Sequence, residues 1–422
     1  MSLKYFCTII LCLMFSLFPV ILLAGDGDSE SMQNGKDEML LASKENEEQL
    51  LYAYYGNDAT VITSTRYLKP VSQVAENMSV VTADMIKQMN AHTVAEALNV
   101  ITGVQVDERL VFSNYSAAGI QGTGFGYVRI LIDGVTLNNL TSNGYLLGNL
   151  PVQYIERIEI IKGPASSSWG SSLGGVINIV TKSGAPNNKI SGMLSSSYGE
   201  RGSGDYRGEA GGQVSKLNYY VSGTYLGSNG FTPYSALTNS TFYTKEKLDL
   251  TDKVNIVYTL GYTNIERGNG YYAILGNIYG NSGLHDLFTT LTLNASLTDQ
   301  LSLSIGGRYI NIYEDDIYYR KGRTSDTLYQ DQLDDEHSKG ATVTLTWRPE
   351  GHTITLGSDY DDGKATNLSV MGGDKTLTKT AFFVNDTVSL IKNVYITPGL
   401  RFDEISANGN FLSPSLGIAY NP

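Results

Sequence analysis

Regular alternation of side-chain type runs through the second half of the chain and limits what it can fold into. In residues 254–263, 301–306 and 341–347, apolar or aromatic side chains occupy every second position, with mostly small or polar side chains between them. A helix repeats every 3.6 residues, whereas successive side chains of a strand point to opposite faces. The pattern continues from about Lys189 to Tyr420 and predicts about twelve antiparallel strands with one apolar face.

The connections between these predicted strands fall into two kinds. Tight turns are expected near Lys216, Asp252, Asp299, Gly351 and Lys392, and long loops rich in Gly, Asn, Tyr and Asp lie between them. A soluble β-sandwich would also alternate. However, short and long connections segregate to opposite ends, and the 29 tyrosines suit interfacial girdles, so a transmembrane β-barrel is favoured. No internal stretch is long and apolar enough for a spanning helix, so closed strands are how this chain would satisfy its backbone in lipid.

The N-terminal residues have the composition of export and linker segments. Residues 1–24 combine Lys4 with an uncharged apolar run ending at Ala24, which predicts a cleaved signal peptide; a membrane anchor is the alternative. Residues 25–57 are acidic and poor in large apolar side chains, so we expect a disordered periplasmic tether. The net charge of −12 argues against nucleic acid as a partner. Both cysteines, Cys7 and Cys12, lie in the predicted signal peptide, so no disulfide framework is expected in the mature chain.

Residues 58–182 read as a small α+β domain. The run DATVITSTR at 58–66 is β-prone and is expected to be free to add itself to the edge of a partner's sheet. Thr82 and Thr93 are predicted helix caps, and strands are expected around 104–106 and 127–135. The stretch IERIEIIKGPASSSWGSSLGGVINIVTK at 155–182 reads as two strands joined by a Gly, Pro and Ser hinge. A flexible loop is one reading of that hinge; a phosphate-binding loop is disfavoured because no Lys follows its glycines.

These motifs together resemble a known family. DATVITSTR, VVTADMIKQMNAHTVAEALNVITGVQV, VRILIDGVTLNN and the 155–182 stretch stand in the order and spacing of the plug domain of TonB-dependent outer-membrane receptors. The plug is most similar to those of vitamin B12 and siderophore receptors, and the resemblance continues at 392–404 and 411–420. It implies a plug domain at 64–185 inside a barrel at 186–422. It also implies that the hinge lets the plug backbone pass close to the barrel wall and rearrange.

The resemblance also implies functional residues. The TonB box would be Asp58, Ala59, Thr60, Val61, Ile62 and Thr63. Ligand contacts are expected from the plug apex at Arg109, Phe112, Asn114, Tyr115, Asn138, Asn139 and Tyr145, and from a barrel loop at Tyr271 and Tyr272. Arg157 is the expected ionic lock between plug and barrel. The implied function is energy-coupled uptake, across the Gram-negative outer membrane, of a scarce metal chelate such as a ferric siderophore or cobalamin. The implied partners are the TonB-ExbB-ExbD complex, outer-membrane lipid and the ligand.

Several features depart from the family or leave alternatives open. Ile120-Gln121-Gly122 stands where most members have Ile-Arg-Gly, and about twelve strands are counted where the family has 22, so we expect a C-terminally truncated receptor. A non-transporting surface-binding barrel or an inactive fragment is the alternative function. No catalytic constellation stands out, so an enzyme is not expected. Acidic runs at 314–316 and 334–336, and Asp359, Asp361 and Asp362, could order calcium, although solvated loops are the simpler interpretation.

Overall fold

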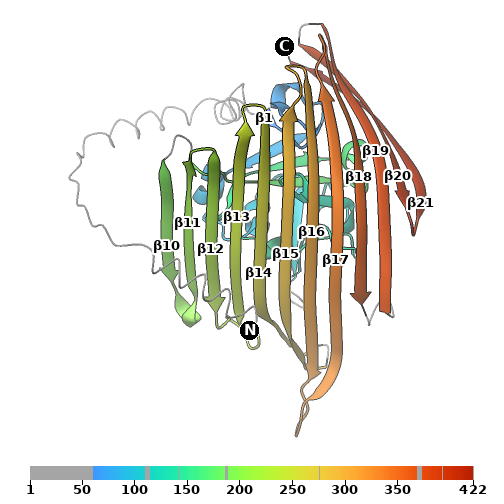
Figure 1. Ribbon diagram of the computed structural model, residues 1–422. Coiled ribbons are helices and arrows are strands. Elements are labelled where there is room, and N and C mark those ends of the chain that lie inside the picture. The colour runs from blue at the N-terminus through green and yellow to red at the C-terminus, as the bar shows by residue number, and fades with distance from the viewer. Residues whose placement is uncertain are drawn as a thin grey trace, which may run out of the picture. The chain divides into compact units, whose positions relative to one another are not determined.

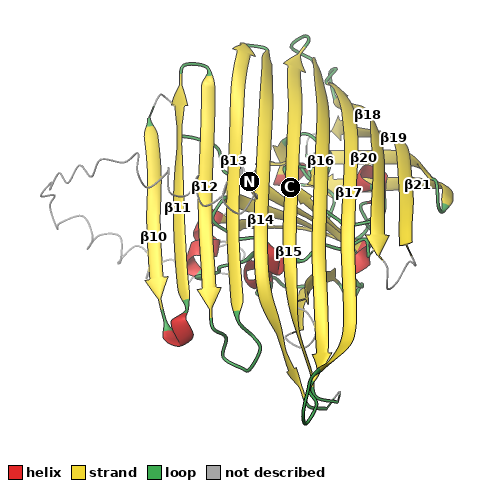
Figure 2. Ribbon diagram, turned by 60° about the horizontal axis from the view of Figure 1, so that its bottom comes forward, coloured by secondary structure: helices red, strands yellow, loops and turns green. Residues whose placement is uncertain are grey.

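Twelve antiparallel strands form a single sheet, which we call the wall, in the computed structural model of the chain. The structure describes residues 60–109, 115–140, 142–185, 189–274, 276–367, 373–391 and 393–421. Each wall strand pairs with the next one along the chain, as Figure 2 shows. The strands are β10 Ile190–Tyr198, β11 Gly204–Val214, β12 Leu217–Ser228, β13 Leu237–Thr251, β14 Val254–Tyr272, β15 Ile278–Ser296, β16 Leu301–Arg320, β17 Thr327–Trp347, β18 His352–Asn367, β19 Gly373–Ile391, β20 Val394–Ile405 and β21 Gly409–Tyr420. The prediction of about twelve antiparallel strands is confirmed.

Short and long connections alternate along the wall. Two residues join β11 to β12, and a tight turn at 297–300 joins β15 to β16. The connections at 229–236, 273–277 and 321–326 lie at the opposite ends of the strands and are longer. At that second end β16 and β17, with 20 and 21 residues, extend as a long hairpin (Figure 1). We call it the outer end.

The two faces of the wall differ in the way that the alternation predicts. Polar or small side chains such as Thr241, Thr259 and Thr355 are buried on the inner face. Large apolar side chains are exposed on the other face, including Leu291, Ile305, Val343, Leu356, Phe382 and Leu400. An exposed apolar band of this extent is expected where a sheet faces lipid.

The N-terminal described residues form an α+β domain, which we call the plug, on the inner side of the wall. Its central sheet has the order β3-β8-β9-β6-β7 and mixes antiparallel pairs with the parallel pair β6 and β9. The bounds are β3 Met78–Thr82, β6 Val128–Ile132, β7 Val135–Thr136, β8 Ile155–Lys162 and β9 Gly175–Thr181. Two further pairs lie outside this sheet: β1 Thr60–Val61 with β2 Lys69–Pro70, and β4 Val104–Arg109 with β5 Tyr115–Ile120.

The described helices of the plug are short, and two of them begin at threonine caps. The Thr82 hydroxyl accepts a hydrogen bond from Met85 N at the start of α4 Ala83–Gln88, and Thr93 accepts one from Glu96 N at the start of α5 Val94–Leu98. Both predicted caps are therefore present. The Glu96 carboxylate accepts from His92 N, one residue before the position that a standard capping box uses. The third helix in the described part of the plug is α6 Ser166–Trp169, and the 3₁₀ turns there are η1 Val71–Gln73, η2 Phe125–Tyr127 and η3 Leu147–Asn149. A further 3₁₀ turn, η4 Glu200–Gly202, lies between the wall strands β10 and β11. None of the described helices is long and apolar enough to cross a membrane.

The main apolar core joins the plug to the wall. It fills the space between the plug sheet and helices α4 and α5, and it extends to wall residues including Tyr220, Tyr243 and Phe288. Tyr154 of the plug stacks on Tyr243 of β13 with ring centroids 4.5 Å apart. A smaller core on the opposite face of the plug sheet surrounds Trp169. The plug therefore has apolar contacts with the wall in addition to polar ones.

The Gly, Pro and Ser hinge packs against the wall and contains a short helix, α6. Ser167, Ser168 and Trp169 of α6 are buried, and the helix packs against β19, β20 and β21. Gly170 has a φ of +69°, and a Cβ atom there would lie 3.3 Å from Asp403 Oδ1. The closeness to the wall that the family resemblance implied is thus present, and it explains the small residues.

The wall is not closed. Among the described residues, β10 and β21 each pair with one neighbour only and form the two edges of the sheet. Side chains on both faces of β10 are exposed, because the plug does not reach that strand. Open edges expose unpaired backbone groups, which are unfavourable in lipid.

Candidate functional site

The first described residues of the chain are held against the plug. We call residues 60–66 the box segment. Its strand β1 pairs with β2, with Thr60 opposite Pro70 and Val61 opposite Lys69. The segment was expected to be free for a partner's sheet, but here β2 already occupies one of its edges. The predicted box residues Asp58 and Ala59, the tether and the signal peptide lie outside the described residues.

A buried carboxylate fixes the middle of the box segment. Glu159 of β8 is completely buried, and its Oε2 accepts hydrogen bonds from Ile62 N and Thr63 N at 3.0 Å and from Thr63 Oγ1 at 2.6 Å. Trp169 Nε1 donates to Thr63 O at 2.6 Å, and Asn178 Nδ2 donates to Thr63 Oγ1 at 3.0 Å. A buried carboxylate needs such donors, because its desolvation is otherwise costly. Glu159 thus stabilises the docked form of the segment.

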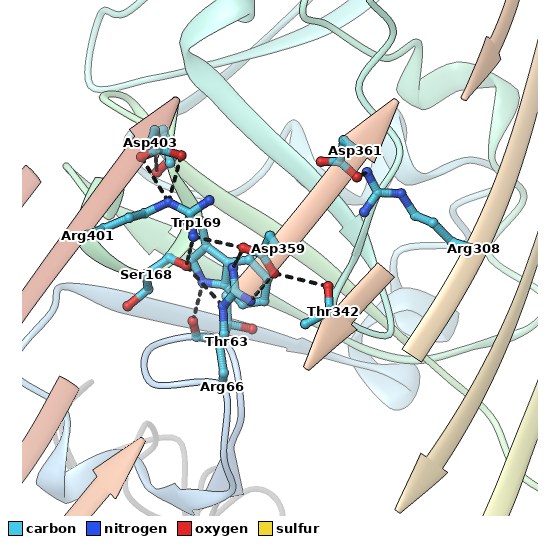
Figure 3. A network of polar contacts seen from close by, with 12 residues as sticks. Thr63, Arg66, Ser168, Trp169, Arg308, Thr342, Asp359, Asp361, Arg401 and Asp403 are labelled. Carbon is cyan, nitrogen blue, oxygen red and sulfur yellow. Dashed lines mark hydrogen bonds and ion pairs between the residues drawn. The ribbon is translucent and has the colours of Figure 1, made fainter. Parts of the chain in front are cut away.

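The end of the box segment is tied to the wall by a charged network, shown in Figure 3, that we call the Arg66 network. Arg66 donates through both terminal nitrogens to Asp359 of β18, at 2.9 and 2.8 Å, and through Nε to Ser168 O at 2.9 Å. Arg401 of β20 donates to the same Asp359 at 2.8 Å and pairs with Asp403 at 2.9 Å. The Arg66 guanidinium also lies 4.2 Å from the ring centroids of Trp169 and Phe383. One carboxylate therefore serves two arginines, one from the plug and one from the wall.

Arg157, the expected lock, makes no ion pair with the wall among the residues that the structure describes. Its guanidinium pairs with Glu156 and Glu159, both on its own strand. Its role here is to balance the buried Glu159 charge. Arg66 carries the charged link to the wall at this point, and Lys182–Glu209 and Asp133–Lys245 add two further links. The sequence did not indicate Arg66, because its partner Asp359 lies 293 residues away.

The acidic residues near 360 are engaged with cations from the protein. Asp359 is paired as described, Asp361 pairs with Arg308, and Asp362 pairs with Lys339. In the part of the chain that the structure describes, no group of three or more potential ligands is arranged to hold a metal ion. Calcium at residues 359–362 is therefore not supported.

Three of the predicted apex residues make hydrogen bonds within the protein, two inside the plug and one to the wall. Asn138 accepts from Ile130 N and donates to Val128 O and Asn143 O, so it closes a loop. Asn139 accepts from Ser142 N and Ser142 Oγ. The Tyr145 hydroxyl donates to Asp286 of β15 at 2.9 Å in a buried contact.

Of the other expected ligand contacts, two lie on paired plug strands, two lie on the wall and two lie outside the described residues. Arg109 and Tyr115 are opposite each other in the β4 and β5 pair. Phe112 and Asn114 lie outside the described residues. Tyr272 donates to Asn269 O, and Tyr271 is 37% exposed and donates to Asn277 Oδ1 at 2.8 Å.

A partly exposed group of tyrosines at the outer end includes Tyr271, one of the predicted ligand contacts. Tyr234 lies between Tyr271 and Tyr279, with centroid distances of 6.1 and 4.2 Å, and Tyr279 is 5.6 Å from Tyr319. Lys321 Nζ lies 5.7 Å from the ring centroids of Tyr234 and Tyr271. The tyrosines come from three strands and one loop, and only strand register brings them together. Tyr271 and Tyr319 stand opposite Tyr279, and Tyr279 has the same parity on β15 as the outward-facing Leu291, so these rings lie on the face of the wall turned away from the plug.

Lys69 leads to a prediction on pH. Its side chain is buried beside β1, and its ammonium has no hydrogen-bond partner among the described residues. Burial lowers its pKa from 10.5 to about 8, against a weaker opposing effect of Glu76. The folded chain then binds fewer protons than the unfolded chain between about pH 8 and 10.5, so stability rises with pH in that window, by up to about 3 kcal/mol.

Lys69→Met should abolish this rise and be more stable than the wild type at pH 7. Guanidinium unfolding followed by tryptophan fluorescence tests this, with exposed Lys339→Met as the control; an unchanged slope for Lys69→Met would contradict it.

Comparisons with known proteins identify both parts of the chain. Residues 70–176 match the TonB-dependent receptor plug domain, and residues 218–422 match the TonB-dependent receptor-like β-barrel. The vitamin B12 transporter BtuB of Vibrio vulnificus strain YJ016 is 36% identical over 126 residues, which are 30% of this chain and 21% of that protein. The chain therefore matches about a fifth of the length of this curated relative.

Solved receptor structures share the fold. The ferric citrate transporter FecA aligns with a TM-score of 0.69 at 17% identity, over 83% of this chain and 61% of that one. BauA, the ferric preacinetobactin receptor of Acinetobacter baumannii, aligns with a TM-score of 0.67 at 14% identity, over 86% and 64%. With a plug seated on the inner face of an antiparallel wall, and both parts matching the corresponding family models, the chain belongs to the family of TonB-dependent receptors.

Proposed function

We propose that the chain is an outer-membrane receptor for the energy-coupled uptake of a metal chelate such as a ferric siderophore or cobalamin. One observation carries the proposal: the box segment is bound at the same time to the plug through Glu159 and to the wall through Asp359. A force applied at its N-terminal side therefore acts directly on the contact between plug and wall. The names of the relatives, a vitamin B12 transporter and ferric chelate receptors, supply the ligand class.

In this proposal TonB, energised by ExbB and ExbD, binds the box segment as an added strand. Pairing at β1 requires the segment to leave β2 or to use its other edge. Ligand at the outer end would have to favour the released segment energetically, because a ligand shifts an equilibrium only by its differential affinity for the two states. Tyr272, which stands opposite the buried Ile278 on the inward face of the strand pair, is the proposed outer contact.

The outward apolar residues support placement in the outer membrane. Leu291, Val343 and Phe382 face away from the plug and are more than a third exposed. The periplasmic side would then be the end with short turns, as in bacterial outer-membrane barrels. The predicted tether would extend from this side toward the inner membrane.

Uptake in cells tests the proposal. In a host lacking its own cobalamin and siderophore receptors, cells expressing the chain should accumulate labelled cobalamin or one of a panel of ferric siderophores. Deleting residues 58–63 should reduce accumulation to that of cells with an empty vector, whereas deleting six tether residues, 31–36, should have little effect.

Two results would contradict energy-coupled uptake. In one, ligand stays bound at the surface and is unaffected by the deletion of 58–63, which would identify a binding protein without transport. In the other, no ligand of the panel accumulates although surface labelling shows the chain in the outer membrane. Disulfide trapping of an Ile62→Cys variant with a cysteine variant of TonB measures the partner contact independently of the ligand.

A further inference from the structure

A cavity at the contact between plug and wall carries more positive than negative charge. Its volume is about 50 Å³, and it adjoins a second cavity of about 160 Å³ that shares Arg66, Trp169 and Thr342 with it. The cations lining the smaller cavity are Arg66, Arg129, Arg308, Lys379 and Arg401, and the carboxylates are Asp359, Asp361 and Asp403. Five cations face three carboxylates, an excess of two positive charges.

The carboxylates are already used. Asp359 pairs with Arg66 and Arg401, Asp403 with Arg401, and Asp361 with Arg308. Arg129 and Lys379 make no hydrogen bond or ion pair with any residue that the structure describes. These two side chains therefore account for the excess charge.

Of the two side chains, Arg129 is the more deeply buried. It stands on β6, is 8% exposed, lines the cavity, and its Nε has no partner. Burial lowers its pKa to about 10, so it remains protonated at neutral pH. Asp361 and Asp403 attract it, but each already forms an ion pair with another arginine, Arg308 or Arg401. Burying a cation that has no paired counter-charge of its own is unfavourable, because such shared attraction offsets only part of the desolvation cost.

We propose that this cavity is a binding site for a small inorganic anion, of the size of phosphate or chloride, held by Arg129 and Lys379. A guanidinium offers several N–H donors in a plane and matches an oxyanion well, and an ammonium adds a second charge. The volume of about 50 Å³ is suited to an ion of this size. Hydroxyl groups of Thr292, Ser304 and Thr344 line the adjoining cavity, which provides a polar approach.

The anion would stabilise the contact between plug and wall. Arg129 belongs to the plug and Lys379 to β19 of the wall, so an ion between them neutralises repulsion across the contact. Anion binding and the stability of this contact should then be linked, because a ligand that binds only the native state stabilises it. The site does not depend on transport, so the purified full chain is sufficient to test it.

Equilibrium dialysis with labelled inorganic phosphate provides the test, at constant ionic strength in a chloride-free buffer. The wild type should bind phosphate saturably, with about one ion per chain at saturation. Arg129→Met should lose saturable binding, Lys379→Met should bind more weakly, and Arg320→Met should bind like the wild type, because Arg320 is exposed at the outer end of β16. Added sodium chloride should compete with phosphate at the same site.

Thermal unfolding supplies a second readout. Phosphate should raise the unfolding midpoint of the wild type and of Arg320→Met but not that of Arg129→Met. Without phosphate, Arg129→Met should be at least as stable as the wild type, since the substitution removes an unpaired buried charge. Should Arg129→Met fail to fold, Lys379→Met carries the comparison. The proposal is overturned if the wild type binds no phosphate saturably, if Arg129→Met or, in its place, Lys379→Met binds as the wild type does, or if Arg320→Met loses binding equally.

Discussion

Trypsin should cleave after Arg66 much faster in an Asp359→Asn variant than in the wild type. In the wild type the Arg66 side chain is 9% exposed and is held by Asp359, Ser168 and two aromatic rings. The amide keeps the size of the carboxylate but removes the negative charge that Arg66 contacts among the described residues, and it also leaves Arg401 paired with Asp403. Breaking a buried ion pair on one side costs about 3–5 kcal/mol, so the docked state of the box segment should lose most of its advantage.

Asp362→Asn is the matched control. Asp362 lies three residues away on the same strand, but it pairs with Lys339, whose side chain is 69% exposed. Exposed pairs contribute about 0–1 kcal/mol, so cleavage after Arg66 should be unchanged. Cleavage at equal rates in the two variants would show that Asp359 does not hold the segment.

Glu159→Gln should have the second largest effect, on the stability of the plug and on the amides of the box segment. One oxygen of Glu159 accepts three hydrogen bonds from Ile62 and Thr63, and the other accepts from Arg157. A glutamine must turn its NH₂ group toward one of these sets of donors, where it cannot accept their hydrogen bonds. It also removes a negative charge that compensates the Arg157 charge. We expect a loss of about 2–4 kcal/mol in the free energy of unfolding.

Two measurements separate local from general effects of Glu159→Gln. Hydrogen exchange should accelerate at residues 60–66 more than in β9, and guanidinium unfolding should report the total loss. Glu156→Gln is the control, because Glu156 is exposed and contacts only Arg157 among the interactions described here. If Glu156→Gln destabilises the chain as much as Glu159→Gln does, the buried hydrogen bonds are not the cause.

Local sequence patterns predicted the architecture well. Alternation in residues 254–263 or 341–347 specifies a strand and its two faces within a few residues, and tight turns such as the one near Asp299 follow from local chemistry. The caps at Thr82 and Thr93 are equally local. The strand count followed directly from these signals.

The site was harder to predict because its contacts join distant segments. Arg66 ends a β-prone run, and Asp359 stands among other acids, so neither has a local feature that marks it as a partner of the other. Asn138 and Asn139 illustrate a different limit. An asparagine in a loop can either bind a ligand or close its own turn, and its hydrogen-bond partners in the structure distinguish the two roles. The sequence of the hinge suggested a flexible loop, because Gly and Ser do not form a core by themselves. In the structure the buried Trp169 side chain fixes the hinge and donates a hydrogen bond to Thr63 O.

The direction of the outermost strands restricts how the wall can be completed. Eleven consecutive antiparallel pairings separate β10 from β21, so these two strands run in opposite directions. An even number of additional strands would therefore close a ring with antiparallel pairing throughout, whereas an odd number would force one parallel seam. Any polypeptide that completes this cylinder by antiparallel pairing has to satisfy that parity rule, whatever its sequence.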